Sequence, residues 1–181
     1  MAAYLMSIDS NHMLEVGLEG LYGQSVPGKQ EINPGGVLVG TDFISDNQVP
    51  QVDFATIHLY PEQRLASASE RDQAVFADKW VEVHIQDSNT ILNKPNIMCE
   101  FGKSSNSSGC SIEKRDSCFG SLCDAIYPSA SNRGSCAGGL FWQVLAQGMD
   151  GFSDGYEVIL EQSPSTASVI AHQPRRMAAL I

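Results

Sequence analysis

Four short apolar segments, each running directly into polar or aromatic side chains, constrain the fold of this chain most. Runs of this kind, uniformly apolar rather than alternating, are typical of strands that are buried on both faces in a parallel sheet. Each segment therefore predicts a strand with functional side chains at its carboxyl end. The four segments are residues 13–18, 52–57, 97–99 and 139–141.

Helical patterns lie between these segments. Ser67 and Glu70 have capping-box spacing, and apolar residues recur after them at helical intervals, which predicts a helix over 67–83. The long Gly- and Pro-rich connection over 23–51 contains one short predicted helix, near 42–46. The apolar residues of the first pattern are Phe76, Trp80 and Val83.

Two further helices are predicted in the second half of the chain. An apolar stripe at i, i+3, i+4, i+7 over 119–126 predicts a helix that ends at Pro128. Ser163 is a capping residue with Pro164 at the first helical position, and Pro174 is expected to close that helix. Strands that alternate with helices predict βα units around a parallel sheet, an α/β fold.

Glu100, His58, Tyr60 and Trp142 follow three of the predicted strands. A carboxylate at the end of a buried strand is costly unless it is partnered or used, so a functional Glu100 is favoured over a surface glutamate. His58 and Tyr60 are two residues apart and share a strand face, from which both can bond to Glu100. A core histidine remains equally open for His58, and core packing is the more common role for a lone tryptophan such as Trp142.

Charge and composition exclude several other functions. The net charge of −10, from 21 acidic and 11 basic residues, disfavours binding to nucleic acid phosphates. No apolar run approaches the roughly 20 residues of a membrane-spanning helix. No metal-ligand spacing occurs, so no metal and no cofactor is expected, and the cysteines are interpreted as buried free thiols. These are Cys99, Cys110, Cys118, Cys123 and Cys136.

Six motifs in order resemble the plant endo-β-1,4-mannanases of glycoside hydrolase family 5. The resemblance covers nearly the whole chain and implies one partial domain, residues 1–181. It also implies that the fold is the C-terminal half of a (β/α)8 TIM barrel, equivalent to strands five to eight. The matching segments are residues 14–23, 39–44, 53–61, 100–104 (Glu-Phe-Gly-Lys-Ser), 138–143 and 148–157 (Gly-Met-Asp-Gly-Phe-Ser-Asp-Gly-Tyr-Glu).

The resemblance implies endo-hydrolysis of β-1,4-mannosidic bonds in mannans, galactomannans and glucomannans by a retaining double displacement. Glu100 matches the nucleophile, His58 and Tyr60 match the pair that supports it, and Trp142 matches a tryptophan under the reacting sugar. The implied partner is a mannan-type polysaccharide. The family also implies an extracellular, cell-wall location, although the N-terminus of this chain does not read as a signal peptide. Asn106-Ser107-Ser108 fits an N-glycosylation sequon.

Two departures from the family concern activity. The family's acid/base glutamate lies in an Asn-Glu-Pro segment, and no Asn-Glu dipeptide occurs in this sequence. Arg64 stands in place of a tryptophan, which puts one sugar-stacking contact in doubt. The first four strands are expected to be absent, because Met1 precedes what reads as the last turns of a helix. The chain is then either a weak or inactive mannanase, a non-catalytic sugar-binding half-barrel, or a partner-binding protein.

Overall fold

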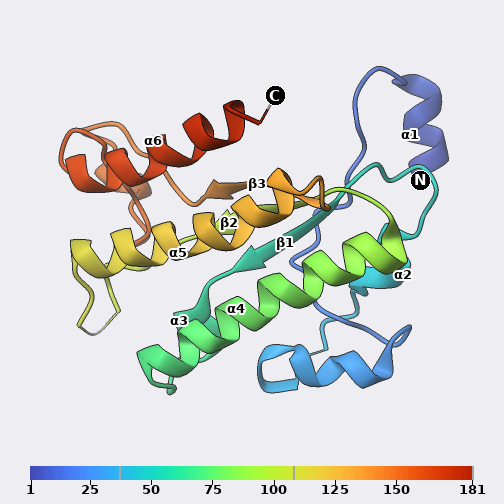
Figure 1. Cartoon of the computed structure of the whole chain (residues 1–181), viewed down its shortest axis with the longest axis horizontal. Coiled ribbons are helices and arrows are strands. Elements are labelled where there is room, and N and C mark those ends of the chain that lie inside the picture. Colours follow the sequence, from blue (N-terminus) through green and yellow to red (C-terminus); the bar gives the residue numbers. More distant parts are fainter. Residues whose placement is uncertain (37, 108, 181) are drawn as a thin grey trace.

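A three-stranded parallel sheet, in the order β1, β2, β3, forms the centre of the computed structural model, which describes residues 1–36, 38–107 and 109–180. Three of the predicted strands are confirmed within a few residues. Each connection between neighbouring strands contains a long helix, so the sheet is built from consecutive βα units (Figure 1). The strands are β1 (Ala55–Leu59), β2 (Asn96–Phe101) and β3 (Cys136–Phe141).

The strand predicted over 13–18 is wrong. This segment has no regular strand, although it lies beside β1, where the Thr56 hydroxyl donates to the Leu18 carbonyl at 2.9 Å. Gly17 (φ +66°) and Gly20 (φ +99°) have left-handed backbone conformations. Such residues break the extended repeat that a regular ladder requires, so the segment stays irregular.

Helix α4 (Glu70–Asp87) covers one face of the sheet and confirms the prediction over 67–83 except at its start. The cap is Ser69, whose hydroxyl accepts a hydrogen bond from the Asp72 N–H at 3.1 Å, and not Ser67. Trp80, on the predicted stripe, is buried. The short helix near 42–46 is also confirmed, as α2 (Phe43–Asn47).

Helices α5 (Ile112–Ser131) and α6 (Pro164–Ala178) confirm the other two helix predictions but extend past the expected prolines. Pro128 and Pro174 lie inside the helices rather than at their ends. A proline removes its own N–H from the helical ladder and crowds the carbonyl four residues earlier, but its own carbonyl can still accept. The Pro128 carbonyl accepts from the Asn132 N–H at 3.1 Å, so the last turn of α5 is retained.

The remaining helical segments are short. Helix α1 has no buried residue, whereas α3 begins directly after β1 at the carboxyl edge of the sheet. The segments are α1 (Ala2–Ile8), α3 (Pro61–Arg64), the 3-10 turns Pro27–Ile32, Pro34–Gly36 and Asp150–Phe152, and a π-helical turn, Ser88–Leu92.

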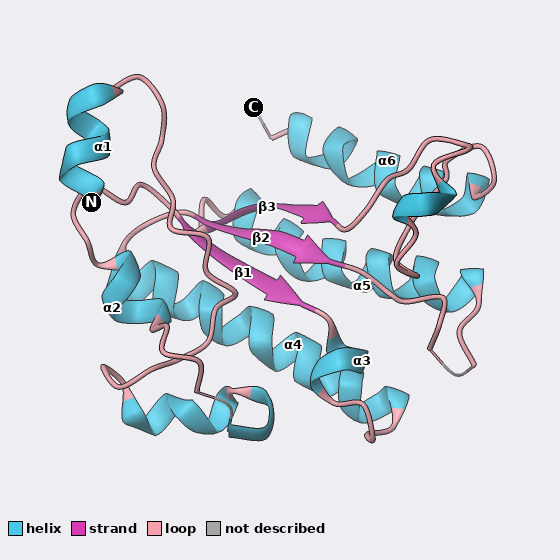
Figure 2. Cartoon of the chain, turned by 180° about the vertical axis from the view of Figure 1, so that it is seen from behind, coloured by secondary structure: helices cyan, strands magenta, loops and turns pink. Residues whose placement is uncertain are grey.

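The hydrophobic core lies between the sheet and the helices. Helices α4 and α5 lie side by side over one face of the sheet, with α6 next to α5 (Figure 1). Seen from behind, the strands lie in front of these helices, and no described helix covers that second face (Figure 2). No helix among the described residues is long and apolar enough to cross a membrane. The largest buried side chains include Trp80, Tyr22, Phe43, Phe119, Ile57, Leu59 and Met98.

Candidate active site

A bulge in the pairing of β1 with β2 determines where Glu100 lies. The register is regular from Ala55 to Ile57, which pairs with Met98, and then shifts so that His58 pairs with Glu100. Cys99 is the extra residue in β2. A bulge of one residue re-aims the side chains that follow it, so Glu100 and His58 lie directly opposite each other near the carboxyl edge of the sheet.

Two side chains from β1 and the residue after it reach the same oxygen of Glu100. The Tyr60 hydroxyl donates a hydrogen bond to Oε2 at 2.9 Å, and Nδ1 of His58 lies 3.5 Å from that oxygen. Because both contacts fall on Oε2, the other oxygen, Oε1, is the one left for chemistry. The side chain of Glu100 is 35% exposed. Burial raises the pKa of Tyr60 above its usual value, and the hydrogen bond to Glu100 adds to this, so the hydroxyl remains a donor.

Trp142 lies at the neighbouring strand end. Its backbone N–H donates to the Phe101 carbonyl at 2.8 Å, at the end of the pairing of β2 with β3. The side chain is 40% exposed, so it is not a core tryptophan. Its indole Nε1–H donates to Oδ2 of Asp154 at 2.7 Å, and its peptide bond to Gln143 is cis.

Tyr156 is a site residue that the sequence analysis did not single out. It is buried, and its ring packs edge-to-face on Tyr60, with centroids 5.0 Å apart. Its hydroxyl accepts a hydrogen bond from Nε2 of Gln63 at 2.7 Å. Burial, followed by the charge of Glu62, raises its pKa. The only signal in the sequence was the motif over 148–157, which carried no assigned role.

Other glutamates that might have replaced the absent acid are engaged elsewhere. Glu15 accepts from the Thr56 hydroxyl at 2.5 Å, and Glu62 accepts from the Ser104 N–H at 2.9 Å. Glu19 forms an ion pair with Arg64, the residue in place of the expected tryptophan. Glu157 accepts from the Gly155 N–H at 2.7 Å. None of these contacts places a second carboxyl group opposite Glu100.

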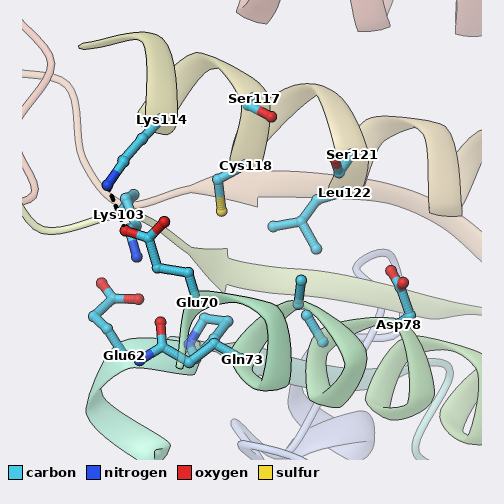
Figure 3. A pocket seen from close by; sticks show the side chains of 13 residues that line it. Glu62, Glu70, Gln73, Asp78, Lys103, Lys114, Ser117, Cys118, Ser121 and Leu122 are labelled. Carbon is cyan, nitrogen blue, oxygen red and sulfur yellow. Dashed lines mark hydrogen bonds and ion pairs between the residues drawn. The ribbon is translucent and has the colours of Figure 1, made fainter. Parts of the chain in front are cut away.

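A separate pocket of about 260 Å³ lies between α4 and α5 (Figure 3). Lys114 and Glu70 form an ion pair across its mouth, with Glu62 and Lys103 nearby. Cys118 points into it, and burial raises the pKa of its thiol to about 11. The mixed charges do not indicate one class of ligand, and Glu100 does not line this pocket.

The structure shows how deeply the cysteines are buried and where the described part of the predicted sequon lies. All five cysteines are free, but only Cys136 is fully buried and the other four are partly exposed. The described residues contain no group of three or more His, Cys, Asp or Glu that could hold a metal ion. Asn106 lies in the loop after β2, whereas Ser108 of the sequon lies outside the described residues.

Comparisons with curated proteins confirm the predicted resemblance. The chain is 53% identical over 180 residues to a putative mannan endo-1,4-beta-mannosidase 9 of Oryza sativa subsp. japonica. It is 50% identical over 181 residues to mannan endo-1,4-beta-mannosidase 1 of Arabidopsis thaliana. These alignments cover 99% and 98% of this chain but only 44% of each relative, so the chain spans less than half their length. No protein-family model matches the chain.

Solved structures confirm the fold class. An endo-beta-1,4-mannanase from Thermotoga petrophila matches with a TM-score of 0.78 and 24% identity, over 99% of this chain and 39% of that one. An endo-1,4-beta-mannanase from Rhizomucor miehei matches with a TM-score of 0.72 and 25% identity, over 98% of this chain and 44% of that one. The three-stranded sheet with its helices therefore corresponds to part of a (β/α)8 barrel.

Proposed function

We propose that this chain, which is similar over nearly its whole length to plant mannan endo-1,4-beta-mannosidases, is the nucleophile-bearing part of a retaining endo-β-1,4-mannanase. Its substrates would be the internal β-1,4-mannosidic bonds of mannans, galactomannans and glucomannans. The observation that carries the proposal is the hydrogen bond from Tyr60 to Glu100 at the carboxyl edge of a parallel sheet. Residues 1–181 then act as one partial glycoside hydrolase domain.

In this mechanism Glu100 is the nucleophile. Tyr60 and His58 both lie at Oε2, so Oε1 attacks the anomeric carbon while the bond to the leaving oxygen breaks. Water later hydrolyses the glycosyl–enzyme ester, and the configuration of the sugar is retained. Trp142, half-exposed at the adjacent strand end, offers an apolar face on which the reacting sugar can stack.

A retaining mechanism requires a second carboxyl group in addition to that of Glu100. It would stand about 5 Å from the nucleophile, protonate the leaving oxygen and then activate water. The sequence has no Asn-Glu dipeptide, and the contacts of Glu15, Glu19, Glu62 and Glu157 in the described residues offer none of these four for this role. Loss of general-acid catalysis costs about 10² to 10⁴ in rate, so turnover of natural mannan by this chain is expected to be very slow.

An activated substrate separates the nucleophile from the missing acid. Dinitrophenolate leaves without protonation, so 2,4-dinitrophenyl β-mannobioside should release about one equivalent per chain and leave a mannobiosyl ester on Glu100. Peptide mass spectrometry would locate the ester. The Glu100→Gln variant should show no burst, and Tyr60→Phe should slow it roughly tenfold through loss of one charge-assisted hydrogen bond.

Glu82→Gln, which changes an exposed glutamate on α4, is the matched control and should leave the burst unchanged. An equal burst from the Glu100→Gln variant would show that another residue reacts and would remove Glu100 as the nucleophile.

A non-catalytic sugar-binding role is the second candidate. The exposed face of Trp142 beside a site without an acid favours it. Binding of β-1,4-mannohexaose without any burst from the activated substrate would support this role over the enzyme. In either case we propose a mannan-type polysaccharide as the partner and an extracellular, cell-wall location. The acidic charge of the chain argues against nucleic acid as a partner.

A further inference from the structure

A short segment, residues 154–156, crosses the carboxyl edge of the sheet next to Trp142. The Ser105 N–H donates to the Gly155 carbonyl at 2.6 Å, which fixes the segment to the loop after β2. Gly155 has φ +92°, and a Cβ at this position would collide with the side chain of Asn106. Only glycine satisfies both the conformation and the close approach, so the path of the segment is tightly determined.

The carboxylate of Asp154, the first residue of this segment, accepts hydrogen bonds from both a backbone donor and a side-chain donor. Oδ1 accepts a hydrogen bond from the Tyr156 N–H at 2.9 Å, which orients the carboxylate relative to its own backbone. Oδ2 then accepts from the indole Nε1–H of Trp142 at 2.7 Å. A carboxylate held on one side by the backbone is a fixed acceptor, and an acceptor with a full charge binds a donor more strongly than a neutral one.

The charge on this acceptor persists at acidic pH. Burial raises the pKa of Asp154, but hydrogen bonds from Trp142, from the Tyr156 backbone and from Gln143 outweigh it, and the pKa lies below its usual value. Asp154 is exposed, so these contacts add little to the stability of the fold. Their effect falls on the orientation of the Trp142 indole, which is 40% exposed.

Tyr156, the last residue of the segment, contacts the other side of the site. Its ring packs on Tyr60, the hydrogen-bond donor to Glu100, and its hydroxyl is held by Gln63. Residues 154–156 therefore contact both Trp142 and Tyr60, the residue that donates a hydrogen bond to Glu100. A single segment links two side chains that come from different strands.

We propose that residues 154–156 form a brace that holds Trp142 and Tyr60 at fixed positions around Glu100, and that Asp154 is the positioning residue for Trp142. Asp154 does not touch the sugar; it sets the plane of the indole on which the sugar stacks. The expected effect of Asp154 on sugar affinity rests on the proposed function. Its expected effect on the orientation of the Trp142 indole does not, so one expectation can fail without the other.

The first experiment measures the indole directly, without sugar. The chain has two tryptophans, and they give two indole N–H signals in a ¹⁵N-correlated NMR spectrum. Trp80 is buried, and its Nε1 has no hydrogen-bond partner among the described residues, so the two signals should be well separated. The Trp142→Phe variant assigns them. In Asp154→Ala the Trp142 signal should move upfield and broaden while the Trp80 signal stays in place. Asp154→Asn, which keeps an oxygen acceptor, should restore much of the original position.

Asp150→Ala is the matched control, because Asp150 is an exposed aspartate in the same loop. This variant should leave the Trp142 signal unchanged. An unchanged Trp142 signal in Asp154→Ala would overturn the brace, whatever the chain does with sugar.

The second experiment measures affinity for β-1,4-mannohexaose by isothermal titration calorimetry. Asp154→Ala should weaken binding roughly fivefold, the effect of losing one oriented hydrogen bond. In a Trp142→Phe background the same change should have no further effect, because the residue that Asp154 positions is gone. Equal weakening in both backgrounds would overturn the positioning role. Absence of any binding by the unaltered chain would instead defeat the proposed function, and the NMR result would then decide the brace alone.

Discussion

The buried histidine of α4 makes the stability of this fold depend on pH in a direction that can be worked out. His84 is fully buried, with Nδ1 at 2.7 Å from the Trp80 carbonyl and Nε2 at 2.7 Å from the Gly20 carbonyl. Two acceptors favour the imidazolium, but burial outweighs them and lowers the pKa to about 4. The ring is therefore neutral at pH 7 and donates to only one of the two carbonyls at a time.

The magnitude follows from the difference between the folded and unfolded pKa values. An unfolded histidine titrates near 6.5, so between pH 6.5 and 4 the unfolded chain binds more protons than the folded chain. The free energy of unfolding therefore falls as the pH is lowered through this range and keeps its full value above it. The whole contribution is about 3 kcal/mol, of which about 2 kcal/mol should be lost between pH 7 and pH 5.

Urea unfolding at pH 7, 6 and 5, followed by tryptophan fluorescence, measures this loss. Carboxyl groups with lowered pKa values, such as Asp42, lose their stabilising contribution only near pH 4 and below, outside the window. His84→Asn should flatten the dependence, and His172→Asn, an exposed histidine on α6, should not. Should His84→Asn fail to fold, the imidazole resonances of the unaltered chain decide the question.

Stability that stays flat or rises between pH 7 and pH 5 would refute the reasoning. It would mean that the two carbonyl oxygens stabilise the imidazolium enough to offset the effect of burial. The pKa of His84 in the folded chain would then be no lower than in the unfolded chain.

Two further predictions concern the same part of the core. Gly20→Ala should lower the free energy of unfolding by at least about 2 kcal/mol, because φ is +99° and the new Cβ would lie 2.9 Å from a buried isoleucine side chain. The control is Gly28→Ala, where a new Cβ would meet no atom within 4 Å. Lys29→Met should cost about 3 kcal/mol in urea unfolding, because it leaves Asp87 buried without its cation. Lys114→Met, at an exposed ion pair, should change stability far less, and equal losses would contradict the burial argument.

The order of strands and helices was predictable because short apolar runs alternate along the sequence with helical patterns. The apolar run of β2, residues 97–99, makes the polar Glu100 that follows it stand out. Residues 13–18 look the same in composition. Their backbone conformation is set by Gly17 and Gly20, which no apolar pattern reveals.

The sequence singled out the residues of the candidate site, but it could not give their geometry. Glu100, His58, Tyr60 and Trp142 could be singled out because they are polar or aromatic residues at or just after the ends of predicted strands. The bulge at Cys99, which turns Glu100 toward His58, depends on hydrogen-bond register between strands far apart in sequence. Asp154 acts through a contact between a loop and Trp142, and a loop aspartate gives no periodic signal.

The support of Glu100 lies within this chain, whereas the acid it would need in catalysis does not. The Tyr60 hydroxyl donates a hydrogen bond to Oε2, and the ring of Tyr156 packs against that of Tyr60. Under the proposed function, attack by Glu100 can therefore be tested separately from protonation of the leaving oxygen. Absence of a burst from the activated substrate would count against Glu100 as the nucleophile even if NMR shows Trp142 held by Asp154, because the indole contact does not involve Glu100.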